Sequence, residues 1–139
     1  MITAEDTEAF TESNEYYNPV QGEVHTIDIM DLVETYRILA EQDKSPSLAA
    51  SLVDEEYDEW SEANITRDKA AELKEMADLV YVIFGLANAN GWDLNKAIKR
   101  VHENNVGRMY QEDGNIKYRE DGKVVKNKHY PIVNLEDLV

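Results

Sequence analysis

Two neighbouring helical segments between Leu48 and Leu86 carry acidic residues on faces that would otherwise be apolar. Leu48 and Leu52 begin one face at helical spacing, and its next positions are Glu55, Glu56 and Glu59. The second face consists of Leu79, Val82, Ile83 and Leu86, and it is preceded by Glu75 and Asp78. Carboxylates are rarely buried unless they are paired, protonated or bound to a metal ion. The pattern therefore indicates an acidic site between two helices.

A short connection at residues 64–66 makes these two helices antiparallel neighbours. Glu56 and Glu75 lie at nearly equal sequence distances from Ile65, so they face each other at about the same level. Glu59 and Asp78 lie about one turn away on either side. We therefore expect four carboxylates to converge, which is an oxygen-rich arrangement preferred by hard divalent cations such as Mg²⁺.

The alternative is that each acidic pair belongs to an ordinary solvated helix face. This chain is rich in acids, with 29 Asp and Glu against 14 Lys and Arg, so coincidence has to be considered. Position favours the metal site, because both acidic sets interrupt apolar stripes and the hairpin brings them together. The formal net charge of −15 argues against a nucleic-acid or anionic-membrane binder.

Length and composition predict one domain over residues 1–139, globular rather than disordered. The chain has no Cys, which excludes disulfides and thiolate metal sites. Its acidic N-terminus does not resemble a signal peptide, and the apolar run 79–89 is too short to span a bilayer. We therefore expect a soluble cytoplasmic protein.

The helix signals predict an all-α fold with four antiparallel core helices. The expected helices cover residues 27–42, 46–63, 66–90 and 94–105, with Thr26, Ser45, Thr66 and Asp93 as their respective N-caps. We interpret residues 1–24 as an extended arm, 25–109 as the helical core and 110–139 as a basic hairpin and irregular tail. The turn signals Asp113-Gly114 and Asp121-Gly122 favour that small hairpin.

Most basic residues follow the acidic half of the chain. They are Lys96, Lys99, Arg100, Arg108, Lys117, Arg119, Lys123, Lys126 and Lys128. A metal-binding acidic half followed by a basic segment suits a polyanionic ligand that chelates a metal ion. For most of these residues an ordinary solvated surface is the competing interpretation.

Several strings of residues resemble a known family. Glu55-Glu56-Tyr57-Asp58-Glu59, followed after fifteen residues by Glu75-Met76-Ala77-Asp78, resembles the EExxE…ExxD signature of the all-α nucleoside triphosphate pyrophosphohydrolases. That superfamily includes MazG-like enzymes, dimeric dUTPases, dCTP pyrophosphatases and phosphoribosyl-ATP pyrophosphohydrolases. Gly91-Trp92-Asp93-Leu94 and Val101-His102-Glu103-Asn104-Asn105 are similar to the phage-encoded MazG-like branch. The resemblance covers about residues 30–130.

The resemblance implies roles for individual residues. Glu56, Glu59, Glu75 and Asp78 would be the Mg²⁺ ligands, with Mn²⁺ able to substitute, and Glu55 would lie behind them or orient water. Asn105 matches an Asn at the nucleotide site, Arg108 stands where that branch commonly has Lys, and Lys126 matches a tail Lys that reaches phosphates. Tyr81 and Trp60 offer flat walls for a base, although core packing is the other interpretation of Trp60. Tyr36-Arg37 departs from an aromatic–His pair of the phage relatives, which leaves base selection open.

The implied reaction converts a nucleoside triphosphate to its monophosphate and pyrophosphate, with dGTP or GTP as the preferred guess. A dUTP or dCTP pyrophosphatase of the same fold is the alternative. The resemblance also implies a homo-oligomer, either a dimer or a tetramer built as a dimer of dimers. From other classes, an acidic DNA mimic and a non-catalytic metal-binding module remain as rivals.

Overall fold

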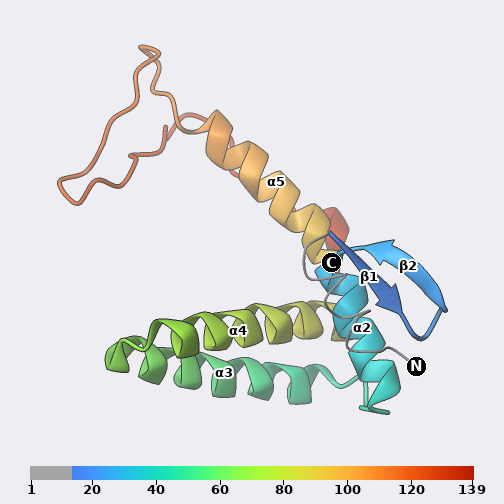
Figure 1. Ribbon diagram of the computed structural model, residues 1–139. Coiled ribbons are helices and arrows are strands. Elements are labelled where there is room, and N and C mark those ends of the chain that lie inside the picture. The colour runs from blue at the N-terminus through green and yellow to red at the C-terminus, as the bar shows by residue number, and fades with distance from the viewer. Residues whose placement is uncertain (1–13) are drawn as a thin grey trace. The chain divides into compact units, whose positions relative to one another are not determined.

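The computed structural model describes residues 14–139 (Figure 1). In this part of the chain there are four α-helices, α2 (Ile29–Leu39), α3 (Pro46–Thr66), α4 (Lys69–Ala89) and α5 (Leu94–Gly107). They are accompanied by a two-stranded antiparallel hairpin, β1 (Glu15–Asn18) and β2 (Glu23–Thr26), and by a 3-10 turn, η1 (Glu136–Leu138). The all-α prediction is thus confirmed. No helix among the described residues is long and apolar enough to cross a membrane.

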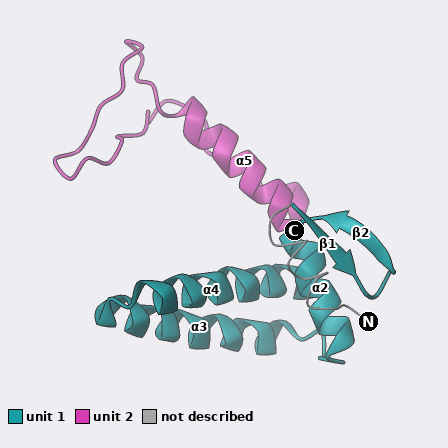
Figure 2. Ribbon diagram, in the orientation of Figure 1, with its two compact units in different colours: residues 1–91 teal, residues 92–139 magenta. Residues whose placement is uncertain are grey.

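The chain divides into two compact units, Met1–Gly91 and Trp92–Val139, which are coloured separately in Figure 2. In the first unit, α3 and α4 lie antiparallel along their whole length (Figure 1), and α2 packs on α4. Among residues 14–139, the buried apolar residues are Val33 on α2 and Phe84 and Ala87 on α4. A Cβ at Gly85 would lie 3.5 Å from Val33 Cγ1, so this glycine faces α2. The single-domain organisation remains a prediction.

The extended arm expected over residues 1–24 is wrong where the structure describes it. Tyr16 and Tyr17 on β1 pair with His25 and Val24 on β2. The side chain of Asn18, 1% exposed, accepts from the backbone N–H groups of Val20 and Gln21 and so shapes the connecting turn. Phe10 and the rest of residues 1–13 lie outside the described residues.

The hairpin is fixed to the first turn of α2 through the carboxylate of Asp31. The hydroxyl of Tyr16 donates to Asp31, and His25 Nδ1 lies 3.2 Å from Asp31 Oδ2. The amide of Asn18 is 3.4 Å from both oxygens of the same carboxylate. These contacts with Asp31 explain why the mainly polar residues of β1 and β2 form a hairpin.

Two predicted N-caps are confirmed and two are wrong. The side chains of Ser45 and Asp93 accept from the N–H groups of Leu48 and Lys96 and begin α3 and α5 as expected. Thr26 and Thr66 do not cap helices, because β2 extends through Thr26 and α3 continues through Thr66. Asp28 and Asp68 take their places, accepting from the N–H groups of Met30 and Ala71.

In the second unit the C-terminal segment returns along α5. Arg100 forms a two-bonded ion pair with Asp137, at 2.6 and 2.8 Å, and Asn104 donates to the carbonyl of Pro131. The predicted hairpin is reduced to one bridge between Tyr118 and Val124. The tail therefore lies against α5.

Candidate functional site

The α3–α4 hairpin brings acidic side chains from both helices together. Arg67, in the left-handed conformation with φ 57°, ends α3, and Asp68 begins α4 at once. The chain therefore reverses in two residues. Glu56 on α3 and Glu75 and Asp78 on α4 each offer a carboxylate oxygen within 4.8 Å of the others. The structure thus brings together three of the four carboxylates expected to converge.

Glu59 and Glu55 lie outside this group of three. Glu59 is exposed one turn along α3 and interacts with Glu56 through a hydrogen bond and through charge. Glu55 is exposed and belongs to the adjacent face of α3. The ligand role of Glu59 and the water-orienting role of Glu55 remain predictions.

The three carboxylates carry more negative charge than their surroundings neutralise. Oε2 of Glu56 and Oε2 of Glu75 are both buried without a hydrogen-bond partner. Burial raises the pKa of Glu56, and a hydrogen bond with Glu59 and the negative charges of Glu59, Asp78 and Glu75 raise it further. Lys74 partly compensates, with Nζ 2.6 Å from Asp78 Oδ2 and 3.4 Å from Glu75 Oε1. Unpaired, partly buried carboxylate oxygens fit a hard divalent cation.

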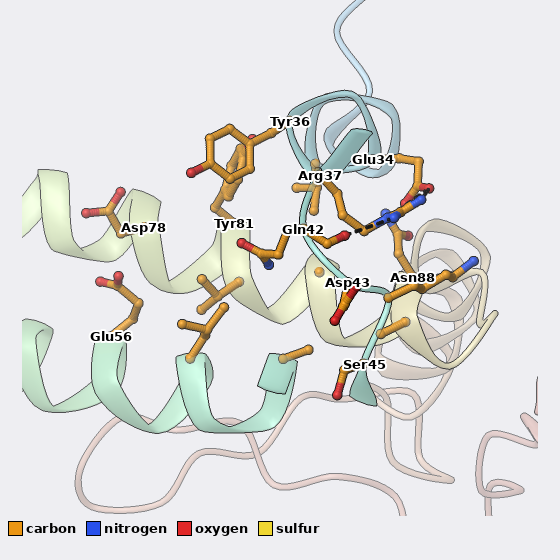
Figure 3. A pocket seen from close by; sticks show the side chains of 17 residues that line it. Glu34, Tyr36, Arg37, Gln42, Asp43, Ser45, Glu56, Asp78, Tyr81 and Asn88 are labelled. Carbon is orange, nitrogen blue, oxygen red and sulfur yellow. Dashed lines mark hydrogen bonds and ion pairs between the residues drawn. The ribbon is translucent and has the colours of Figure 1, made fainter. Parts of the chain in front are cut away.

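A cavity of about 420 Å³ adjoins the carboxylates (Figure 3). It lies within the first unit, between α2, the segment after α2, and the facing sides of α3 and α4. Glu56 and Asp78 line it together with the apolar residues Leu52, Val82 and Gly85. Concave, mainly apolar pockets of this size with a few polar groups are typical of small-molecule sites.

Aromatic rings form part of the cavity wall. Tyr81 on α4 and Tyr36 on α2 both line it, and their rings meet edge to face with centroids 6.0 Å apart. The prediction of a flat wall at Tyr81 thus fits the geometry. Trp60 is not among the lining residues: its ring packs against Tyr57 at 5.9 Å, and its buried Nε1 has no hydrogen-bond partner. The base-stacking role of Trp60 remains a prediction.

The sequence analysis did not predict which polar residues line the cavity beside α2. Glu34 and Arg37 form an ion pair, with Arg37 Nη2 2.6 Å from Glu34 Oε1, and both line the cavity with Gln42, Asp43 and Asn88. The i, i+3 spacing of Glu34 and Arg37 was a usable signal for the pair. The helix predicted over residues 27–42 is shorter in the structure: α2 ends at Leu39, so Gln42 and Asp43 lie in the segment after it.

Three predicted nucleotide contacts belong to the second unit. Lys126 Nζ donates to Asn105 Oδ1 at 3.1 Å, so the structure brings these two predicted residues together near the end of α5. Arg108 is the C-cap of α5, and its buried Nε has no hydrogen-bond partner. Their contacts with a nucleotide remain predictions.

The comparison with protein families gives one match. The family model for phosphoribosyl-ATP pyrophosphohydrolase matches residues 33–105. No curated protein matches the chain. The matched span is more than half of the 139 residues and contains α3 and α4 with Glu56, Glu75 and Asp78. The chain therefore belongs to the phosphoribosyl-ATP pyrophosphohydrolase family of nucleotide pyrophosphohydrolases.

Proposed function

We propose that this protein is a divalent-metal-dependent nucleoside triphosphate pyrophosphohydrolase. The observation that carries the proposal is the group formed by Glu56, Glu75 and Asp78 at one end of a largely apolar cavity. Metal-bound phosphates would lie at the carboxylates while the nucleoside enters the cavity. Family membership supports the reaction class, since the family hydrolyses a nucleotide at a pyrophosphate linkage.

Glu56, Glu75 and Asp78 would hold the metal ion, and Glu59 would join them after a change of rotamer. Mg²⁺ is the proposed ion and Mn²⁺ a substitute, because both prefer carboxylate oxygens. When bound, the ion would neutralise charge on the triphosphate and lower the pKa of a water molecule. The buried, unpartnered oxygens of Glu56 and Glu75 support this assignment.

The chain's own contribution is to position the reacting groups. The carboxylates fix the metal-chelated triphosphate at the hairpin, and the cavity restricts the nucleoside, so the α-phosphorus is held in one place. Glu55 or Glu59 would orient the attacking water. The water oxygen bonds to the α-phosphorus, the bond from that phosphorus to the bridging oxygen breaks, and pyrophosphate leaves. Asn105, Arg108 and Lys126 are proposed as further nucleotide-binding residues.

We further propose a purine nucleotide, dGTP or GTP, as substrate. The polar groups along the cavity include acceptors, among them the carboxylate of Asp43 and the amide oxygen of Asn88, whose Nδ2 donates to the carbonyl of Met30. Guanine offers adjacent N–H donors to such groups. A pyrimidine triphosphate such as dUTP or dCTP is the alternative. The role would be control of a cytoplasmic nucleotide pool, during phage infection if the gene is phage-encoded.

A homo-oligomer is proposed because α4 exposes an apolar stripe. Leu73, Met76, Val80 and Ile83 follow one another at spacings of three and four, and each is at least 38% exposed. A second copy presenting the same stripe would bury both and could contribute basic residues to the site. A dimer would be enough to bury the apolar stripe of α4. The family resemblance also supports a tetramer built as a dimer of dimers.

The proposal is tested by measuring pyrophosphate release from a panel of ribo- and deoxynucleoside triphosphates with Mg²⁺, Mn²⁺ or EDTA. We expect metal-dependent release that is lost in Glu56→Gln, Glu75→Gln and Asp78→Asn, while Glu62→Gln, an exposed acid on α3, retains activity. Metal binding without pyrophosphate release from any triphosphate would contradict an enzyme and favour a non-catalytic module. Release preserved in EDTA would contradict the role of the carboxylates.

A further inference from the structure

The segment after α2 carries one polar side chain into the cavity. Glu41 follows α2 with φ 51°, a left-handed conformation that non-glycine residues rarely adopt. The bend turns Gln42 toward α3 and α4, and Figure 3 shows its amide extending into the cavity on the side of Tyr81 and Glu56. Backbone strain of this kind persists where surrounding contacts enforce it, and it is concentrated at functional sites.

Arg37 supplies the contacts that enforce this conformation. Its Nε and Nη2 both donate to Glu34 Oε1, at 3.2 and 2.6 Å, which fixes the guanidinium on α2. Its Nη1 donates to the backbone carbonyl of Gln42 at 3.1 Å, and the Gln42 N–H donates to the carbonyl of Arg37 at 3.0 Å. Gln42 is thus held at its backbone on both sides, while its side chain is left out of this network.

The amide of Gln42 differs from three other polar side chains around the cavity. Asn88 is committed to the Met30 carbonyl, Ser45 caps α3, and Arg37 is engaged by Glu34. The half-buried amide of Gln42 has no hydrogen-bond partner among the described residues. An amide that faces the cavity without a protein partner is available to hydrogen-bond a ligand.

We propose that Gln42 reads the hydrogen-bonding edge of the nucleobase and that Arg37, held by Glu34, is the positioning residue that presents it. The inference rests on the proposed function, because it takes the cavity as the nucleoside site. An amide places one donor beside one acceptor, which matches a base edge with a carbonyl beside an N–H. Stacking against Tyr81 does not choose between bases, so the choice needs polar contacts such as those of this amide.

The experiment measures binding of GMP, AMP, CMP and UMP to the full chain by titration calorimetry with Mg²⁺, so that no turnover is needed. We expect the wild type to bind one nucleotide best. In Gln42→Ala we expect that nucleotide to lose about tenfold in affinity, because two neutral hydrogen bonds are removed, while the weakest nucleotide is little changed. In Gln42→Glu, which presents two acceptors and no donor, the order should shift toward GMP, whose N1–H and amino group are adjacent donors, and away from UMP.

Two further variants separate base reading from general damage. Gln21→Ala removes an exposed amide in the β1–β2 turn, outside the cavity, and should leave all four affinities unchanged. Arg37→Lys keeps the positive charge but cannot hold both Glu34 and the Gln42 carbonyl. We expect Arg37→Lys to reduce the ratio of the affinities for the best-bound and the weakest-bound nucleotide, as Gln42→Ala does, although Gln42 itself is intact.

The outcomes distinguish this proposal from the proposed function. Three results would each overturn base reading by Gln42. They are an equal loss of affinity for all four nucleotides in Gln42→Ala, an unchanged ratio of the best to the weakest affinity in that variant, and equal affinities for all four nucleotides in the wild type. Selective binding that depends on Gln42, in a protein that releases no pyrophosphate from any triphosphate, would leave base reading standing and remove the enzymatic activity. Pyrophosphate release with base selectivity unchanged in Gln42→Ala would support the enzymatic activity and overturn base reading by Gln42.

Discussion

Lys74 Nζ lies 2.6 Å from Asp78 Oδ2, one turn away on α4, and 3.4 Å from Glu75 Oε1. A hydrogen bond to Asp78 and the charges of Asp78 and Glu75 hold the pKa of this ammonium above its usual range. The ammonium occupies carboxylate oxygens that a divalent cation would use. A metal ion that binds at Asp78 must therefore displace an existing charge partner.

The first prediction follows from this competition. Lys74→Gln should tighten binding of Mg²⁺ or Mn²⁺ by about three- to tenfold, because an exposed ion pair no longer has to be broken. Titration calorimetry of the metal-free protein measures the change. Lys69→Gln, at the start of the same helix, is the control for a general change of charge. Unchanged or weaker metal binding in Lys74→Gln would show that the ammonium does not compete.

The second prediction concerns stability and pH in the absence of metal. The pKa of Glu56 in the folded protein is raised above its ordinary value of 4.5, mainly by burial. Its contribution to stability is therefore fully present below the unfolded-state pKa and is lost as pH rises through the folded-state pKa. Glu56→Gln, which mimics the protonated form, should melt at a higher temperature than wild type at pH 7 in EDTA.

The pH dependence makes that result specific to Glu56. The difference in melting temperature should shrink as pH falls below about 4.5, where the wild-type carboxyl is also neutral. Glu62→Gln, an exposed acid on the same helix, should show little difference at either pH. Adding Mg²⁺ should reverse the order at pH 7, because only the wild type gains the full metal site. A variant less stable than wild type in EDTA at pH 7 would refute the prediction.

The third prediction concerns the hairpin that carries the carboxylates. Arg67 ends α3 with φ 57°, a conformation that glycine adopts without steric cost. Arg67→Gly should raise the free energy of unfolding by about 1 kcal/mol, measured by urea denaturation. Gly91→Ala is the opposite case, because Gly91 has φ 74°, and it should lower that free energy by about 1 kcal/mol. A loss of stability in Arg67→Gly would mean that its side chain outweighs the backbone strain.

The fourth prediction concerns assembly. Val80→Glu places a charge in the middle of the exposed stripe formed by Leu73, Met76, Val80 and Ile83, and it should shift an oligomer to a smaller species. Light scattering coupled to size exclusion measures the mass. Ile132→Glu, on a residue that is 79% exposed in the second unit, should leave the mass unchanged. A wild type that is monomeric at micromolar concentration would contradict the proposed homo-oligomer.

Local sequence signals determined the helices and the place of the acidic group. Ser45 before Pro46, and Asp93 before Leu94, were sufficient to begin α3 and α5, because a side-chain cap depends only on residues within one turn. The proximity of Glu56, Glu75 and Asp78 could be predicted from the sequence. The helical rise and the short connection determine how far along each helix these residues lie. Thr66 and Asp68 are both residues that can cap a helix, and they lie two positions apart. The sequence analysis predicted Thr66 as the N-cap of α4, whereas the N-cap is Asp68.

Tertiary structure decided what lies next to the acids. The N-terminal hairpin exists because Tyr16, Asn18 and His25 converge on Asp31, a contact between distant residues that no local pattern indicates. The position of Gln42 depends on the left-handed turn at Glu41 and on its hydrogen bond from Arg37. Periodicity tells which face of a helix a residue occupies, but a loop side chain is directed by backbone torsions and contacts that exist only in the folded chain.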